Sequence, residues 1–182
     1  MESKLLLQVD LEGHSAYMAA HPSKPDAAQS RVEYATVLHK MLDKSHFSLL
    51  SWKGDGGVYA ADPPTSGRPA DFAVRAAEKA AAAFHVWRAK RPDRDVLRFR
   101  ISLHWAPDLY TYPERGYWSS DHLNFFMKYE REIGLSGTVA VTDKVFSHLS
   151  GNCQQRFGRL LDFIQYCVQG VFRNFRIVAQ CH

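Results

Sequence analysis

Two short apolar runs around a glycine-bearing turn are the feature that most restricts how this chain can fold. Residues 46–52 (HFSLLSW) and 57–61 (GVYAA) flank the sequence KGDGG at residues 53–57. Extended runs of this length that meet at a tight, glycine-containing turn are typical of a β-hairpin. Because Asp55 lies in the middle of the turn, the sequence predicts an antiparallel hairpin with an acidic tip.

Helical segments alternate with the extended ones. Residues 26–42 space their apolar side chains at helical intervals, and residues 70–91 are rich in alanine, the residue with the highest helix propensity. A third helix is predicted over residues 119–134, from a serine or aspartate cap to a terminal glycine, and a short helical turn over residues 145–149.

The remaining apolar segments predict strands. They are residues 4–9, 96–105, 137–143, 159–168 and 170–180. The resulting order, β-α-β-β-α-β-α-β-α-β-β, predicts an α+β fold of the ferredoxin-like class, with a central, mainly antiparallel sheet and helices over one face. We see no internal repeat and expect a single domain over residues 1–182.

Composition excludes several other classes of protein. The chain has 182 residues, 46% of them hydrophobic and 23% charged, which suits one globular domain. Its formal charge of +4 comes from scattered basic residues, so we expect no nucleic-acid partner, and an anionic small ligand accounts for the excess equally well.

No apolar run approaches the roughly 18 residues of a membrane span, and no secretion signal follows the start. Three cysteines without a CxxC pair suit a reducing compartment, so we expect a cytoplasmic protein.

Two aspartates follow strands that can be neighbours in a sheet. Asp10 lies where the first strand is expected to end, and Asp55 lies at the hairpin tip. Paired carboxylates suit Mg²⁺ or Mn²⁺, which bind oxygen ligands and retain positions for substrate phosphates. Gly13 and Ser15, near a helix start, could offer backbone amides to phosphate. Either aspartate alone is more often an ordinary turn residue.

Five segments, taken in order, resemble the catalytic domain of class III adenylate and guanylate cyclases. They are VDLEGHSAY (residues 9–17), SWKGDGGVYA (51–60), RFRISLHW (98–105), DHLNFFMK (121–128) and GTVAVTDKVFSHL (137–149). No single segment is decisive, but their order and spacing make the resemblance specific. It implies cyclisation of a nucleoside triphosphate by a homodimer with two Mn²⁺ or Mg²⁺ ions in each site.

The resemblance also assigns roles to particular residues. Asp10, Leu11 and Asp55 fall on the metal-binding positions, and Glu12, Gly13, His14 and Ser15 form the phosphate-binding turn, with His14 in place of a usual aromatic residue. Asn124 falls on the position that orients the ribose. Lys128 falls on the transition-state cation, where an arginine is usual, and it shares a helical face with Asn124.

The two base-selecting positions differ from those of both purine cyclases. Ser51 and Tyr117 occupy them, and together they predict a narrower, less charged pocket than a purine requires. This pair resembles the pyrimidine cyclases of bacterial anti-phage signalling, whose cyclic nucleotide activates a separate effector. We therefore favour UTP, giving cyclic UMP, over CTP or ATP. The alternative is that the alignment at Tyr117 is shifted by one or two residues, in which case Tyr117 does not alter the pocket.

Other departures keep alternatives open. Lys128 lacks the planar fork of an arginine, and Gln169 replaces a usual phosphate-binding lysine, for which Lys53, Arg100 or Arg173 could compensate. A catalytically weak nucleotide-binding or dimerisation module is therefore one alternative, and a palm-like polymerase or dinucleotide cyclase is another. The histidines, His14, His104 and His122 among them, match no common zinc spacing, and we expect packing or solvent roles for them.

Overall fold

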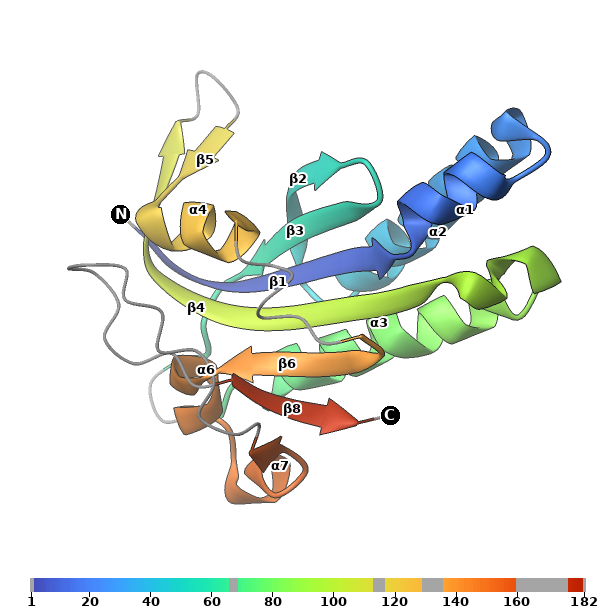
Figure 1. Cartoon of the computed structure of the whole chain (residues 1–182). Helices are drawn as coiled ribbons and strands as arrows, with labels where there is room; N and C mark the ends of the chain where they lie inside the picture. The colour runs from blue at the N-terminus through green and yellow to red at the C-terminus, as the bar shows by residue number, and fades with distance from the viewer. Residues whose placement is uncertain (1, 66–68, 113–116, 129–135, 160–176, 182) are drawn as a thin grey trace.

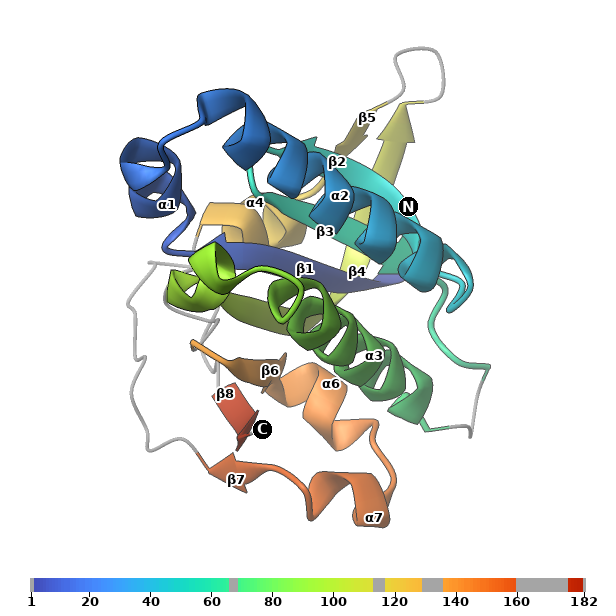
Figure 2. The same ribbon diagram turned by 90° about the vertical axis from the view of Figure 1, so that its right-hand side faces the viewer.

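The computed structural model describes residues 2–65, 69–112, 117–128, 136–159 and 177–181. Its centre is an eight-stranded sheet in the order β2-β3-β1-β4-β6-β8-β7, with β5 beside one end of β4 (Figures 1 and 2). The strands are β1 (Glu2–Glu12), β2 (Ser48–Lys53), β3 (Gly56–Ala61), β4 (Arg98–Tyr112), β5 (Tyr117–Ser119), β6 (Thr138–Thr142), β7 (Gly158–Arg159) and β8 (Ile177–Cys181). Only the β4–β6 pair is parallel among the described pairs, which confirms the mainly antiparallel α+β fold.

The helices follow the predicted order, with some additions. They are α1 (His14–Ala20), α2 (Lys24–Asp43), α3 (Asp71–Arg88), the 3₁₀ helix η1 (Pro92–Val96), α4 (Asp121–Lys128), α6 (Asp143–Ser147) and α7 (Gly151–Gln154). The sequence predicted α2 over residues 26–42 but did not predict α1 as a separate helix. The break between them follows from a cap, because the Ser23 side chain accepts a hydrogen bond from the Asp26 amide and so starts a new helix. No described helix is long and apolar enough to cross a membrane.

Helices cover both faces of the sheet, which corrects the expectation of a single covered face (Figure 2). Alternate residues of β1, including Leu5 and Leu7, pack in one core cluster with α2 and α3. Leu6 points the other way and packs with Leu123 and Phe126 of α4. The central strands are therefore buried on both sides, and we call the second side the α4 face.

Strand β4 runs beyond its predicted end at residue 105 and pairs with β5, which the sequence did not predict. Pro107 lies within this extension, although proline cannot donate a hydrogen bond to a sheet. In the structure it lies beside the register shift of the β1–β4 ladder, where Lys4 pairs with Ala106 and Glu2 pairs with Leu109. Such irregularities are places where a strand tolerates proline.

The C-terminal hairpin is described only in part. β7 and β8 pair antiparallel, Gly158 with Ala179, in agreement with two final antiparallel strands. Residues 160–176 lie outside the described residues, and with them lie Gln169 and Arg173.

Candidate active site

The β1–β3 ladder brings the two predicted carboxylates to one place. Val9 pairs with Gly57, so the following residue of β1, Asp10, reaches Gly56 at the hairpin turn. A Cβ atom on Gly56 would lie 2.7 Å from the Val9 carbonyl oxygen and 3.1 Å from Asp10 Oδ1, so only glycine fits there. Since Asp55 immediately precedes this glycine, the two aspartates lie at the same end of the β1–β3 strand pair.

Asp10 is paired with a cation of the protein itself. The residue is buried, with 8% exposure, and Arg100 lies opposite it in the β1–β4 register. Arg100 Nε donates a hydrogen bond to Asp10 Oδ2 at 3.1 Å, and Arg100 Nη2 donates to the same oxygen. A buried charge needs such a partner, since desolvation is costly.

Asp55 also has a basic partner. His14 Nδ1 lies 3.2 Å from Asp55 Oδ2. Partial burial by itself raises the pKa of Asp55, but the hydrogen bond and charge of His14, together with the charge of Arg31, outweigh it and hold that pKa below its ordinary value. His14 is buried, and its Nε2 atom has no hydrogen-bond partner among the described residues.

The predicted phosphate turn joins β1 to α1. Glu12 ends β1, and Gly13 has φ of 85°, a left-handed conformation that favours glycine. A Cβ atom at Gly13 would also lie 3.1 Å from the Val96 carbonyl oxygen, so the turn packs closely on η1. Ser15 is exposed in the first turn of α1, whereas the Leu11 side chain is in the core.

A hydrogen-bonded cluster holds α1 against η1. Asp93 Oδ2 accepts from the Tyr17 hydroxyl at 2.8 Å and lies 3.0 Å from His21 Nε2. Burial raises the pKa of Asp93, but hydrogen bonds from Arg91, Tyr17 and His21 outweigh it and lower the pKa to about 2. The cluster fixes the helix that follows the phosphate turn.

The other predicted residues lie on or near α4. Asn124 is exposed on this helix, whose start is capped by a hydrogen bond from the Leu123 amide to the Ser120 hydroxyl at 2.8 Å. Lys128 is the last residue of α4, and its side chain lies outside the described residues, as does that of Tyr117 on β5.

Ser51 shares the α4 face. It pairs with Val58, which packs beneath α4, and directly paired residues point to the same side of a sheet. Asp10 is on this side as well. It lies four residues after Leu6 on β1, and every second side chain of a strand points to the same face. The fold thus brings Asp10, Ser51 and Asn124 to one face, but no described contact joins Asn124 to either aspartate.

Two histidines anchor α4 to the sheet. His104 Nε2 lies 3.1 Å from His122 Nδ1, and His104 Nδ1 lies 3.2 Å from Thr142 Oγ1. Burial, with the charges of His122 and Lys144, lowers the pKa of His104 to about 3, so it is neutral at physiological pH. His104 also stacks on Phe126, which is the packing role expected for it.

The pairing of Arg100 with Asp10 and of His14 with Asp55 was not predicted. From the sequence, Arg100 was considered only as a cation that could compensate for Gln169. The four residues come from segments up to 90 positions apart. Strand register supplies the first contact, and the α1 start supplies the second. Among the described residues no group of three or more acidic, histidine or cysteine side chains is arranged to hold a metal ion.

Solved structures share this architecture. An adenylyl cyclase from P. aeruginosa matches with a TM-score of 0.75 and 15% identity, covering 98% of this chain and 93% of that one. An adenylate/guanylate cyclase/hydrolase from Silicibacter pomeroyi matches with a TM-score of 0.72 and 19% identity, covering 100% and 97%. The guanylate cyclase domain of RhGC from Catenaria anguillulae, in complex with GTP, matches with a TM-score of 0.71 and 15% identity, covering 98% and 94%.

Comparison of the sequence with models of protein families and with curated proteins gives no match. At sequence identities of this order, structural similarity establishes the fold but not the activity. The chain therefore has the fold of adenylate and guanylate cyclase catalytic domains.

Proposed function

We propose that this protein is a nucleotide cyclase that converts a nucleoside triphosphate to a 3′,5′-cyclic monophosphate and pyrophosphate. The observation that carries the proposal is that Asp10 lies against Gly56, the residue directly after Asp55, in the fold of cyclase catalytic domains. A turn with a left-handed glycine follows directly, as a phosphate-binding segment requires.

The residues at this end of the β1–β3 strand pair fit a divalent cation. Mg²⁺ is usually bound by one or two carboxylates together with substrate phosphates, so Asp10, Asp55 and the Leu11 carbonyl form a suitable set without a third acidic side chain. Because Gly56 has no side chain, the turn that carries Asp55 can approach Asp10 closely. Two Mn²⁺ or Mg²⁺ ions bound there would supply charge stabilisation and acidify the ribose 3′-hydroxyl.

The chain's own residues then have distinct tasks. Arg100, which is hydrogen-bonded to Asp10, would offer its remaining donors to the triphosphate. Backbone amides of residues 12–15 would hold the outer phosphates. Asn124 would orient the ribose, and Lys128 would offset charge that develops at the α-phosphate.

A homodimer explains why Asn124 is exposed and separate from the aspartates. In the proposed dimer, the carboxylates of one protomer face Asn124 and Lys128 of the other. Among the similar structures are a dimeric guanylyl cyclase domain and adenylate cyclases in a monomeric state. Mixing an inactive Asp10→Asn protein with an inactive Asn124→Ala protein would restore part of the activity only if sites are shared between protomers.

The base pocket favours UTP, with cyclic UMP as a second messenger for a separate effector in anti-phage defence. Ser51 is half-buried on the α4 face, where a short neutral side chain offers hydrogen bonds without charge. With Tyr117 as the second pocket residue, the space suits a pyrimidine. A purine substrate is the second candidate, because similar structures contain GTP or ATPαS.

The test is incubation of purified protein with each of the four ribonucleoside triphosphates and Mn²⁺, with products identified by mass spectrometry. Cyclic UMP is the expected product, and cyclic AMP or GMP would retain the reaction but refute the pyrimidine pocket. Linear or cyclic dinucleotides would indicate a palm-like enzyme, and nucleotide binding without product would indicate a binding module.

Variants link the product to the carboxylates. Asp10→Asn and Asp55→Asn should each abolish turnover and weaken Mn²⁺ binding while the fold is retained. Asp43→Asn, at an exposed position on α2, is the matched control and should keep full activity. Retained turnover in either of the first two variants would refute the assignment.

A further inference from the structure

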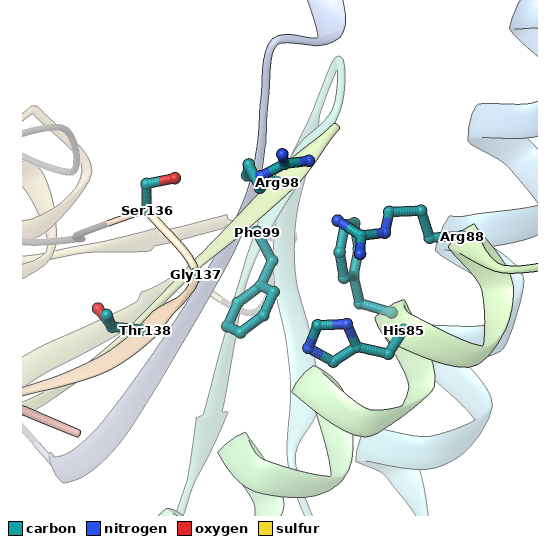
Figure 3. A pocket seen from close by; sticks show the side chains of 8 residues that line it. His85, Arg88, Arg98, Phe99, Ser136, Gly137 and Thr138 are labelled. Carbon is teal, nitrogen blue, oxygen red and sulfur yellow. The ribbon is translucent and has the colours of Figure 1, made fainter. Parts of the chain in front are cut away.

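A cavity of about 430 Å³ opens at the start of β4, on the side of the sheet covered by α3 (Figure 3). This volume is within the range of small-molecule sites. Its lining comprises Phe84, His85, Arg88, Arg98, Phe99, Ser136, Gly137 and Thr138. No carboxylate is among these residues, so the wall is basic on one side and hydroxyl-bearing on the other. We call this cavity the arginine pocket.

Two guanidinium groups converge at its rim. Arg88 Nη1 donates to the Leu97 carbonyl oxygen at 3.3 Å, and Arg98 Nη1 donates to the same oxygen at 2.9 Å. Arg88 also lies over the Phe84 ring, with 5.6 Å from its guanidinium carbon to the ring centroid, which fixes its orientation. Two cations held on one neutral oxygen repel each other.

Neither guanidinium has an anionic partner in the part of the chain that the structure describes. Glu12 lies opposite Arg98 in the β1–β4 register, but the two side chains form no ion pair. Each guanidinium carries five N–H donors, and carbonyl oxygens take only some of them. The rim therefore has surplus positive charge and surplus donors, the combination that binds phosphate.

We infer that the arginine pocket binds a compact phosphate-bearing anion, such as inorganic phosphate, pyrophosphate or the phosphate tail of a nucleotide. Arg88 and Arg98 would share the anion, whose charge would relieve their mutual repulsion. This site is distinct from the carboxylate pair, since its lining includes neither Asp10 nor Asp55 and Arg88 comes from α3.

The pocket is connected to the candidate active site through the backbone. Its anchor, Leu97, directly follows Val96, whose carbonyl oxygen packs on Gly13 of the phosphate turn. An anion that fixes the two arginines on Leu97 would thus also restrain the surface on which that turn rests. Occupancy of the pocket is therefore expected to alter triphosphate affinity at the neighbouring turn.

Binding is tested by isothermal titration calorimetry on the full chain in metal-free buffer with a chelator. Inorganic phosphate, pyrophosphate and UTP are titrated separately, and their order of affinity identifies the form of the anion. Excluding divalent ions makes the measurement independent of turnover, so failure of the cyclase proposal, seen as absence of cyclic product, remains distinguishable.

Arg88→Gln and Arg98→Gln should each weaken pyrophosphate binding about tenfold or more, because each removes a charge-assisted contact. Arg75→Gln, an exposed substitution on the same helix and outside the lining, should bind as the wild type does. If Arg88→Gln impairs folding, thermal melting will show it and Arg98→Gln decides alone. Wild-type protein without millimolar affinity for any of the three anions, or unchanged binding in Arg98→Gln, overturns the inference.

Discussion

Arg100 donates two hydrogen bonds to one carboxylate oxygen of Asp10, the residue directly opposite it across the β1–β4 ladder. The ion pair is therefore set by strand register, without a flexible loop on either side. The side chains of both residues are largely buried, and each neutralises the charge of the other. Either charge buried without its partner would cost folding free energy.

Arg100→Gln should lower the free energy of unfolding by about 3 kcal/mol, because it leaves the Asp10 carboxylate buried without its cation. The double variant Asp10→Asn/Arg100→Gln should lose less than the sum of the single variants. Urea unfolding followed by circular dichroism measures all three. Strict additivity would show that the two groups do not interact.

Gly56→Ala should destabilise the protein by about 2 kcal/mol, since the new methyl group meets the Val9 carbonyl oxygen and the Asp10 carboxylate. It should also weaken Mn²⁺ binding by displacing Asp10. Gly54→Ala, in the same turn, is the control. That residue has φ of 62° but open space around it, so only backbone strain of about 1 kcal/mol is expected. Equal Mn²⁺ affinity in the two variants would contradict close packing at Gly56.

Arg94→Met should cost about 3 kcal/mol of unfolding free energy. Arg94 is 1% exposed and donates to Ser30, to the Trp87 carbonyl and to Glu33 at 2.7, 2.9 and 2.6 Å. The side chain joins α2, α3 and η1, and methionine would leave those partners unsatisfied. Arg94→Lys retains the charge but not the planar fork, so it should recover only part of the loss. Chemical denaturation distinguishes the two, and a change below 0.5 kcal/mol in Arg94→Met, about the range of ordinary surface substitutions, would refute the role.

Acid should weaken the attachment of α1 between about pH 4 and pH 2. The pKa of Asp93 is about 2 in the folded protein, against roughly 3.9 when unfolded. Its contribution to stability is therefore complete above the unfolded value and is lost as pH falls through the folded value. Asp93→Asn should flatten the pH dependence of stability in this window. Denaturation curves at several acidic pH values provide the measurement, and an unchanged slope would contradict the assignment.

Local sequence was sufficient for the elements that depend on nearby residues. The hairpin at Asp55 and helix α3 appear where glycine, alanine and apolar spacing predicted them. The extension of β4 past Pro107 could not be predicted, because it depends on a register irregularity with β1 that only the assembled sheet contains. For the same reason the position of α4 was missed, since an amphipathic helix does not specify which face of a sheet it covers.

The candidate site was predictable in part. The adjacency of Asp10 and Asp55 follows from the fold expected for the motifs, whereas their partners do not. His14 stands where the cyclases that the sequence resembles carry an aromatic residue, and this difference was the one visible signal that the turn holds a polar contact with Asp55. The roles of Lys128 and Tyr117 stay predictions, because their side chains lie outside the described residues.

Strand β4 is hydrogen-bonded to β1 on one side and to β6 on the other. In succession it carries Arg98 at the arginine pocket, Arg100 at Asp10 and His104 beneath α4. Successive side chains of a strand point to opposite faces, so adding or deleting one residue between these positions would turn some of them away from their partners. A one-residue insertion in this stretch that no β-bulge absorbs would therefore break at least one of these three contacts.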